Sequence, residues 1–477
     1  MEPEAGAAHI ACLPDDLLSR IFGHLPFNER HQAVPLVCRR WAQAVVSPHL
    51  LRHIAFDSAT GPRAPPGPSV AQRARSFCAW LGAHAAGHVQ DLELCISTAH
   101  HEDSDDSTSS SFPEVVAMLT ACAAGGSLQR LHLHLQSVPG LRLPASLAAA
   151  LSSLHSLSVE IDEGGFTLDV PLAAWSCLRE LRVAAHTTWE GGWRLVLTPA
   201  ATLPPSLTKL HLCGIGWGLS ESRALPLQIV GLTCLRELSL EGTENGQASY
   251  AALNALGGCL ERLRLGLCSW LPPPSTFAAL SRLTMLSVDT LGEEREIRDE
   301  FEGDVEPVLR VLPQLRHLRL SYASSAYGIS LPRMPRVLAD LHRLTGLWWD
   351  LDIDDRALPD PSGPWLRSLR RLALPDTVLA CNESVLEAAS CQLESLYMLG
   401  TDNLYFGRRV PSTLLALELA VRHTTLSLVH IEGVDVLPVA KPALQAAGQG
   451  HRNVQFESSK LPLFKVGAAF DDAACRG

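Results

Sequence analysis

The pattern Leu-x-x-Leu-x-Leu, with Val at some of its places, recurs along most of the chain and constrains the fold more than any other feature. Most successive copies begin 21 to 32 residues apart. Alternating apolar residues in a short segment are typical of a strand with one buried face. A self-similar period of this length predicts an array of repeats, which shares one long core. The thirteen copies begin at Val89, Leu128, Leu154, Leu178, Leu207, Leu235, Leu260, Leu283, Leu315, Leu344, Leu369, Leu393 and Leu414.

The segments between these copies carry a second apolar face. Residues 113–122, 250–258 and 335–343 have apolar side chains at helical spacing. One repeat cannot bury both its strand and its return limb, whereas stacked repeats can. The sequence therefore predicts parallel strands along a concave side and helices along a convex side.

The repeats resemble those of leucine-rich-repeat proteins over most of residues 89–420. This resemblance implies an α/β solenoid, a horseshoe of about 12–13 repeats. We expect the solenoid to span residues 70–428, with an acidic, serine-rich insertion at residues 100–111. Residues 429–477 are expected to hold an irregular last repeat, a cap and a tail.

The segment before the repeats, residues 12–52, has the pattern of three short helices. Pro14 suits the first position of a helix, and Leu17, Leu18, Ile21, Phe22 and Leu25 follow at helical spacing. A module of about 40 residues cannot bury all of this apolar surface by itself. Part of the surface should meet a partner, or the helices could form an ordinary cap on the repeats. Residues 1–11 are expected to be a tail, and the Pro- and Gly-rich segment 53–69 a linker.

This helical segment resembles an F-box, a module that docks on a Skp-type adaptor and, through it, on a cullin and a RING subunit. The resemblance implies a small three-helix module with no catalytic residue. Pro35 is a mild departure from the family pattern. The residues that carry the likeness, and that the likeness assigns to adaptor binding, are Leu13, Pro14, Leu17, Leu18, Ile21, Phe22, Leu25, Pro26, Val37, Cys38 and Trp41.

Charge and cysteine usage narrow the possible partners and the compartment. The formal net charge of -11 argues against nucleic acid as a partner. The 13 cysteines show no dense disulfide framework, which is typical of a reduced, intracellular protein. No secretory signal and no membrane-spanning run is apparent. We therefore expect a cytoplasmic or nuclear protein, or alternatively one of the cytoskeleton or cilium.

No segment has the pattern of a catalytic, cofactor or metal site. Gly214, Gly216 and Gly218 follow an expected strand, but a dinucleotide-binding turn needs a third glycine where Leu219 stands. His132 and His134 lie two apart on one expected strand and so face one side, and His211 from another repeat could join them to hold a metal, but solvent-facing histidines explain all three without one. We expect a non-catalytic protein with no cofactor and no metal.

The binding surface should lie on the concave face, where the residues between the strand leucines point outward. Exposed Trp, Tyr and Arg are the residues that most often anchor interfaces, and Arg grips carboxylate or phosphate groups. We therefore predict that an acidic or phosphorylated protein substrate binds there. The residues assigned to this surface are Arg262, Arg264, His317, Arg319, Trp348, Asp350, Arg371 and Tyr397.

Taken together, the two resemblances imply the substrate-recognition subunit of a Skp–cullin–F-box ubiquitin ligase. In this reading the helical module binds the adaptor and the concave face holds a protein for ubiquitination. A non-ligase scaffold of cytoskeletal or ciliary assemblies is the alternative, because leucine-rich repeats also occur there. A third possibility is a receptor that seats a small molecule on the concave face, as some plant relatives do.

Overall fold

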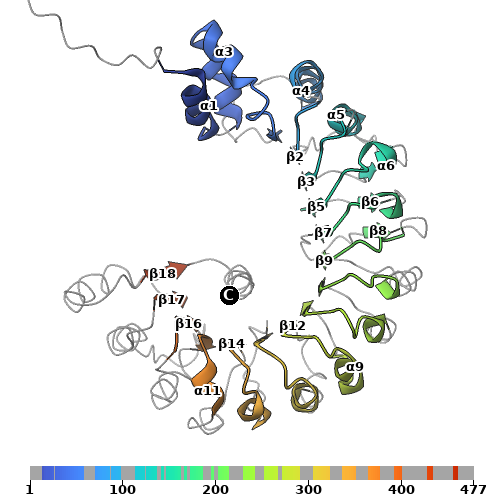
Figure 1. Ribbon diagram of the computed structural model, residues 1–477, viewed down its shortest axis with the longest axis vertical. Helices are drawn as coiled ribbons and strands as arrows, with labels where there is room; N and C mark the ends of the chain where they lie inside the picture. The colour runs from blue at the N-terminus through green and yellow to red at the C-terminus, as the bar shows by residue number, and fades with distance from the viewer. Residues whose placement is uncertain are drawn as a thin grey trace, which may run out of the picture. The chain divides into compact units, whose positions relative to one another are not determined.

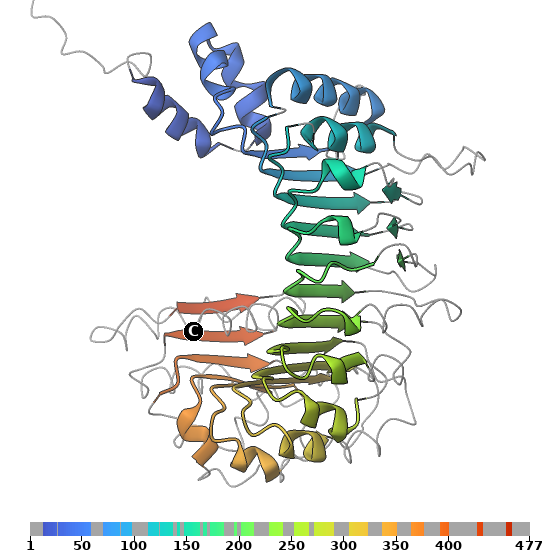
Figure 2. The same cartoon turned by 45° about the vertical axis from the view of Figure 1, so that its right-hand side comes forward.

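The computed structural model divides into two compact units, Met1–Leu235 and Arg236–Gly477, which are described separately (Figures 1 and 2). The structure describes residues 13–25, 27–58, 70–85, 87–97, 113–123, 125–136, 141–143, 147–162, 166–168, 172–185, 195–197, 202–213, 229–241, 252–266, 271–290, 305–322, 336–350, 364–375, 392–399, 427–432 and 455–459.

The first unit begins with the small helical module and continues as a sheet with helices along one face (Figure 1). Its helices are α1 (Asp15–Gly23), α2 (Phe27–Gln32), the 3-10 helix η2 (Val34–Leu36), α3 (Arg39–Val45), α4 (Val70–His84), α5 (Pro113–Ala123), α6 (Leu147–Ala150) and the 3-10 helix η3 (Leu172–Ala174). The strands of its main sheet are β1 (His53–Asp57), β2 (Asp91–Ser97), β3 (Arg130–Gln136), β5 (Ser156–Ile161), β7 (Glu180–Ala185) and β9 (Lys209–Cys213), and all pair in parallel in that order.

The second unit has the same design. Its strands pair in parallel in chain order, and short helices lie along one face of the sheet (Figure 1). The strands are β10 (Glu237–Glu241), β11 (Arg262–Gly266), β12 (Met285–Thr290), β13 (His317–Tyr322), β14 (Gly346–Asp350), β15 (Arg371–Pro375), β16 (Ser395–Leu399), β17 (Leu428–Glu432) and β18 (Gln455–Ser459). The helices are α9 (Pro274–Ala279), the 3-10 helix η4 (Arg336–Asp340) and α11 (Pro364–Ser368).

The strands confirm the solenoid predicted from the repeated leucines. In every copy from Val89 to Leu393, the strand begins two residues after the first apolar position, as with Leu260 and β11. The copy at Leu414 lies outside the described residues, as does the insertion at residues 100–111. The apolar residues at these places point into the core wherever their side chains are described. Leu260, Leu263 and Leu265, for example, are at most 2% exposed.

Two features of the first unit differ from the prediction. Residues 53–57, which were assigned to a linker, form β1, the first strand of the sheet, in register with β2. In addition, three return limbs contain short strands that form a second parallel sheet, where the sequence predicts mainly helices. These strands are β4 (Leu141–Leu143), β6 (Phe166–Leu168) and β8 (Leu195–Leu197).

A serine before the first leucine links several repeats. Ser127 donates from its hydroxyl to the carbonyl of Val89 at 2.8 Å, and Ser153 donates to Leu128 at 2.8 Å. Ser206 and Ser368 make the same bond to the first leucine of the preceding repeat, Leu178 and Leu344. Each bond satisfies a backbone carbonyl at the point where the chain enters a strand.

Candidate functional site

The helical module has a core of its own. Leu18 and Phe22 from α1 pack with Val34, Val45 and Leu50, and all five are at most 6% exposed. The ring of Trp41 meets that of Phe22 edge to face, with 5.1 Å between the ring centroids. Arg40 of α3 ties the start of α1 in place, because its Nε donates to Asp15 Oδ1 at 2.8 Å and its Nη2 donates to the carbonyl of Leu13.

Two pairs of apolar side chains on this module face solvent. Leu17 and Ile21, one turn apart on α1, are 42% and 40% exposed. Leu36 and Val37, at the end of η2, are 85% and 59% exposed. Among the described residues these are four of the five large hydrophobic side chains that are exposed, and Val230 is the fifth. We call the four the exposed apolar pairs. Exposed large apolar side chains that adjoin one another are surface that a protein partner could cover.

The observed exposure changes which of the predicted residues could contact an adaptor. Leu18 and Phe22 lie in the core of the module, so their side chains are not available to a partner. Pro14 and Cys38 are exposed, whereas Leu13, Leu25 and Trp41 are partly buried against the core. Pro26 lies outside the described residues. Leu36 is the most exposed of the apolar set and was not predicted, although it directly precedes Val37 in the apolar run.

A cluster of aromatic rings joins the helical module to the first repeat. On α2, Phe27 and His31 lie 5.8 Å and 4.9 Å from the ring of Trp80 on α4, measured between centroids. Phe77, also on α4, lies 6.2 Å from Phe27 and stacks on Phe56 of β1 at 4.7 Å. Offset and edge-to-face pairs at these separations stabilise such contacts beyond the area that they bury.

His31 should make this contact sensitive to acid. Burial lowers its pKa from 6.5 to about 4, and the charges of Arg30 and His84 add to the effect. Between these two pH values the unfolded chain takes up a proton that the folded chain does not, so the folded state loses stability as the pH falls. Because the ring is partly exposed, we expect a loss of about 1–2 kcal/mol.

Thermal denaturation at pH 7 and at pH 4.5 tests this expectation. The variant His31→Phe keeps an aromatic ring against Trp80 and should show a smaller fall in Tm on acidification than the unaltered protein. An equal fall in both proteins would assign the acid sensitivity to other groups. His155→Phe, at an exposed histidine on the return limb between β3 and β5, is the matched control.

Each main sheet has a face that points away from the helices, which we call the helix-distal face. In the first unit this face is polar and accessible, and ion pairs cross it. His134 bonds Asp162 through Nε2 at 2.9 Å and lies 3.7 Å from Glu160 through Nδ1, while Arg182 lies 3.4 Å from Glu160. His134, one of the histidines considered as a metal ligand, is therefore held by two carboxylates.

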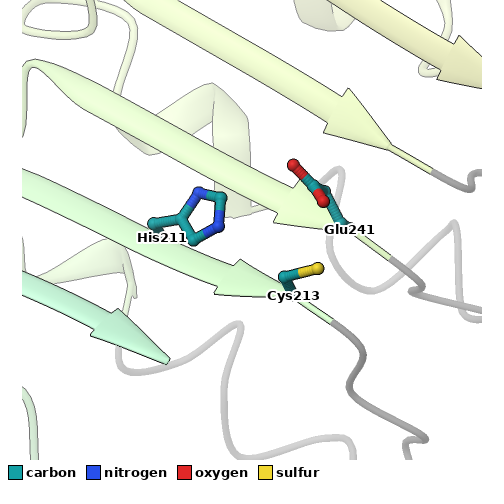
Figure 3. Close-up of side chains that lie close together, drawn as sticks. All are labelled: His211, Cys213 and Glu241. Atoms are coloured by element: carbon teal, nitrogen blue, oxygen red, sulfur yellow. The ribbon is translucent and has the colours of Figure 1, made fainter. Parts of the chain in front are cut away.

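His211 and Cys213 lie on the same face of β9, and Glu241 ends β10 (Figure 3). Glu241 belongs to the second unit, where its Oε1 lies 3.1 Å from Nε of Arg264. Within the described part of the first unit, His211 and Cys213 thus offer two possible ligands. Metal sites in proteins use three or four ligands, so this pair by itself defines no metal centre.

In the second unit, carboxylates pair with the three arginines Arg262, Arg264 and Arg319 of the predicted binding surface. Arg262 lies 3.1 Å from Glu237, and Arg264 lies 3.1 Å from Glu241. Asp289 approaches Arg264 at 3.4 Å and Arg319 at 3.1 Å. Burial raises the pKa of the Asp289 carboxyl, and the two guanidinium groups oppose that rise. The three guanidinium groups are therefore paired within the sheet, because neighbouring strands supply the counter-charges.

The predicted aromatic anchors are buried. Trp348 and Tyr397 are 0% and 5% exposed, and their ring centroids lie 5.9 Å apart beside Ala373. The guanidinium of Arg319, which is 2% exposed, lies 5.2 Å from the centroid of Trp348. These three side chains stabilise the sheet and cannot act as exposed anchors. Asp350 ends β14, and its side chain is outside what the structure describes.

His317 and Arg371 differ from the rest of the predicted set. Both are partly exposed, and neither forms an ion pair with a described carboxylate. Burial lowers the pKa of His317 to about 4, and the charges of Arg371, Arg316 and Arg262 lower it further, so the imidazole is neutral at pH 7. Arg371 therefore carries the one predicted positive charge that the described residues leave uncompensated.

Comparisons with known proteins agree with the helical module. The family model for F-box-like domains matches residues 10–57. A comparison with curated proteins finds no match. Among the described helices, none is both long and apolar enough to cross a membrane.

Among solved structures, the crystal structure of a TDR receptor is similar at 16% identity and a TM-score of 0.36, over 80% of this chain and 65% of that one. The Arabidopsis receptor kinase HAESA, whose leucine-rich-repeat ectodomain was solved with an N-terminal extended IDA peptide hormone, is 13% identical with a TM-score of 0.28. That match covers 71% of this chain and 68% of HAESA. The chain thus spans a little under two thirds of the TDR receptor. The fold assignment itself rests on the parallel strands and their register.

Proposed function

We propose that this chain is the substrate-recognition subunit of a Skp–cullin–F-box ubiquitin ligase. It carries an F-box-like domain at residues 10–57, followed by parallel-strand repeats of the leucine-rich type. The exposed apolar pairs, Leu17 with Ile21 and Leu36 with Val37, are the observation that carries this proposal. They lie on the module that matches the F-box-like family, where that family binds a Skp-type adaptor.

A partner should bind at the exposed apolar pairs because leaving apolar side chains in water costs free energy. The core of the module is complete without them, since Leu18, Phe22, Val34, Val45 and Leu50 fill it. The apolar surface that these four side chains leave exposed is not needed to fill the core, and its burial at an interface would be favourable. A partner with an apolar groove would gain from burying them.

The chain would contribute binding and orientation, and no catalytic group. It would hold a protein close to a ubiquitin-charged enzyme that the cullin and RING subunits recruit. Proximity and orientation alone can raise the rate of a transfer between two bound partners by orders of magnitude. The repeats offer the extended surface that such a receptor needs.

Titration calorimetry with a purified Skp-type adaptor tests the proposal. The unaltered chain should bind, and Leu36→Asp should weaken binding about 100-fold, because a charge at the centre of an apolar contact costs about 2.7 kcal/mol. Val230→Asp is the matched control, since Val230 is the one other exposed large hydrophobic side chain among the described residues and lies outside the module. It should bind like the unaltered chain.

Two outcomes would contradict the proposal. If the unaltered chain fails to bind the adaptor, the ligase role is wrong and a non-ligase scaffold becomes the better reading. If Leu36→Asp and Val230→Asp bind equally well, the adaptor does not use the exposed apolar pairs. Circular dichroism of both variants checks that the charge has not unfolded the module.

A further inference from the structure

A gap in the row of side chains on the helix-distal face of the second unit lies between His317 and Arg371. His317 of β13 is in register with Gly346 of β14, which is in register with Arg371 of β15. Neighbouring strands are about 4.8 Å apart, so roughly 10 Å separate the two backbones that flank the glycine. Gly346 has no side chain to fill this interval.

The imidazole of His317 leans over the glycine. A Cβ atom placed on Gly346 would lie 2.6 Å from His317 Nδ1 and 3.5 Å from its Cε1. Nδ1 therefore overhangs β14 on the side toward Arg371. This nitrogen is buried and has no hydrogen-bond partner among the protein atoms. Any side chain larger than hydrogen at Gly346 would displace the ring.

Arg371, on the strand at the other side of Gly346, lies close enough for its charge to act on His317, and it has a donor that is also unused. Its Nη1 is buried and has no hydrogen-bond partner. The other arginines on this face are compensated, Arg262 by Glu237, Arg264 by Glu241, and Arg319 by Asp289. Among the described side chains, no carboxylate does the same for Arg371.

Buried donors without partners are rare in folded proteins, and each calls for an explanation. Here a guanidinium N–H and an imidazole nitrogen flank one side-chain-free position, and one positive charge remains. With the imidazole in its Nδ1–H tautomer, a group with two acceptor oxygens and a negative charge would satisfy both nitrogens and the charge. We propose that His317 and Arg371 form a binding site for a single oxyanion, a phosphate or carboxylate group, between the imidazole and the guanidinium.

Neighbouring residues define the surroundings of the site. Trp348 lies beside Gly346 in the next row toward the carboxyl ends of the strands, and its ring is fully buried. On the other side of His317 stand Met285 of β12 and Arg262 of β11, in the same row. No acidic side chain lies in this row between Arg262 and Arg371. The surroundings thus favour an anion over a cation.

Binding should depend on pH. Burial disfavours protonation of His317, and the positive charges of Arg371, Arg316 and Arg262 disfavour it further, which holds its pKa at about 4. A bound anion opposes these charges and so raises the pKa, and by linkage the anion binds more tightly as the pH falls toward the raised value. The next charged groups, Arg319 and Asp289, lie 3.1 Å apart and form an ion pair with each other.

The site is independent of adaptor binding, so its test does not involve the ligase role. Inorganic phosphate is titrated into the full chain at constant ionic strength, with ³¹P and imidazole proton resonances as the readouts. We expect saturable binding with a Kd on the order of 1 mM. Binding should be tighter at pH 5 than at pH 7.5, with a rise in the pKa of His317 when phosphate is bound. Arg371→Gln should weaken binding at least tenfold.

Matched variants keep the result interpretable. Arg370→Gln removes the adjacent, exposed arginine that pairs with Glu394 at 3.4 Å, and it should bind phosphate like the unaltered chain. Gly346→Ala should weaken binding by displacing His317, with Arg371 intact. If Arg371→Gln does not fold, Arg371→Lys serves in its place and should bind more weakly because it loses the forked geometry.

The source of the anion is decided by comparing ligands. A phosphoserine peptide that binds more tightly than inorganic phosphate indicates a modified polypeptide, and a peptide rich in Glu that does so indicates an acidic one. Equal affinity for peptide and inorganic phosphate indicates a small anion. The absence of saturable binding to the unaltered chain, or an equal loss in Arg370→Gln and Arg371→Gln, would overturn the site.

Discussion

Replacing Phe22 by alanine should destabilise the helical module by about 3–5 kcal/mol, the usual cost of removing a large buried aromatic side chain. Phe22 is 2% exposed and supports Trp41 at 5.1 Å, so the substitution leaves a cavity that the small module cannot easily refill. Hydrogen exchange is the suitable measurement because it reports opening of one region in a chain of two units. The protected amides of α1 and α3 should exchange about 100- to 5000-fold faster.

The control for Phe22→Ala is Leu17→Ala on the same helix. Leu17 is 42% exposed, so its loss should change amide exchange by less than about 1 kcal/mol. The two variants also separate folding from binding. Leu17→Ala should weaken the adaptor complex while the module stays folded, whereas Phe22→Ala should weaken it through unfolding. Equal exchange rates in both variants would mean that the core is not where the structure places it.

Removing the carboxylate of Asp289 should have an effect of similar size in the second unit. In Asp289→Ala, Arg319 loses the carboxylate 3.1 Å away while it remains almost wholly buried. Leaving a buried charge without its partner typically costs about 3–5 kcal/mol. Amide exchange in β12, β13 and β14 should accelerate accordingly, and the thermal transition of the second unit should move to lower temperature.

An exposed ion pair elsewhere in the second unit supplies the comparison for Asp289→Ala. Glu394 and Arg370 lie 3.4 Å apart with side chains that are 46% and 59% exposed. Glu394→Ala should cost no more than about 1 kcal/mol, as exposed pairs generally do. Should Glu394→Ala prove as damaging as Asp289→Ala, the burial of Arg319 would not be the cause of the larger effect.

The repeat architecture could be predicted from sequence because one local pattern decides it. Leu-x-x-Leu-x-Leu fixes which side chains point inward, and the strands begin where that pattern predicts. The same alternation correctly placed Arg264, Arg319 and Trp348 on the helix-distal face, away from the buried leucines. It could not show that this face is buried there, since the burial of Trp348 depends on which side chains the adjoining repeats bring against it, Ala373 and Tyr397 among them.

The helical module shows a similar limit. Five apolar residues at helical spacing suggested one face on α1, but the structure divides them between two. Leu18 and Phe22 enter the core, while Leu17 and Ile21 are exposed. Helical spacing defines an apolar face that is wider than the part buried in the core. The positions of the other helices determine which side of that face remains exposed to solvent. The exposure of Leu36 depends on the turn that η2 makes around Pro35, which no periodicity encodes.

The aromatic contacts between α2 and α4 affect how this protein should be dissected. A truncation that starts after residue 52 would take away Phe27 and His31 and strip their cover from Trp80 and Phe77. It would also leave β1 as the terminal strand without α1, α2 and α3, and the ends of repeat arrays need such covers to remain soluble. A shortened chain that aggregates or loses its ligands would thus say little about adaptor binding. Single substitutions on the surface of the helices are the cleaner way to separate the two halves of the proposed activity.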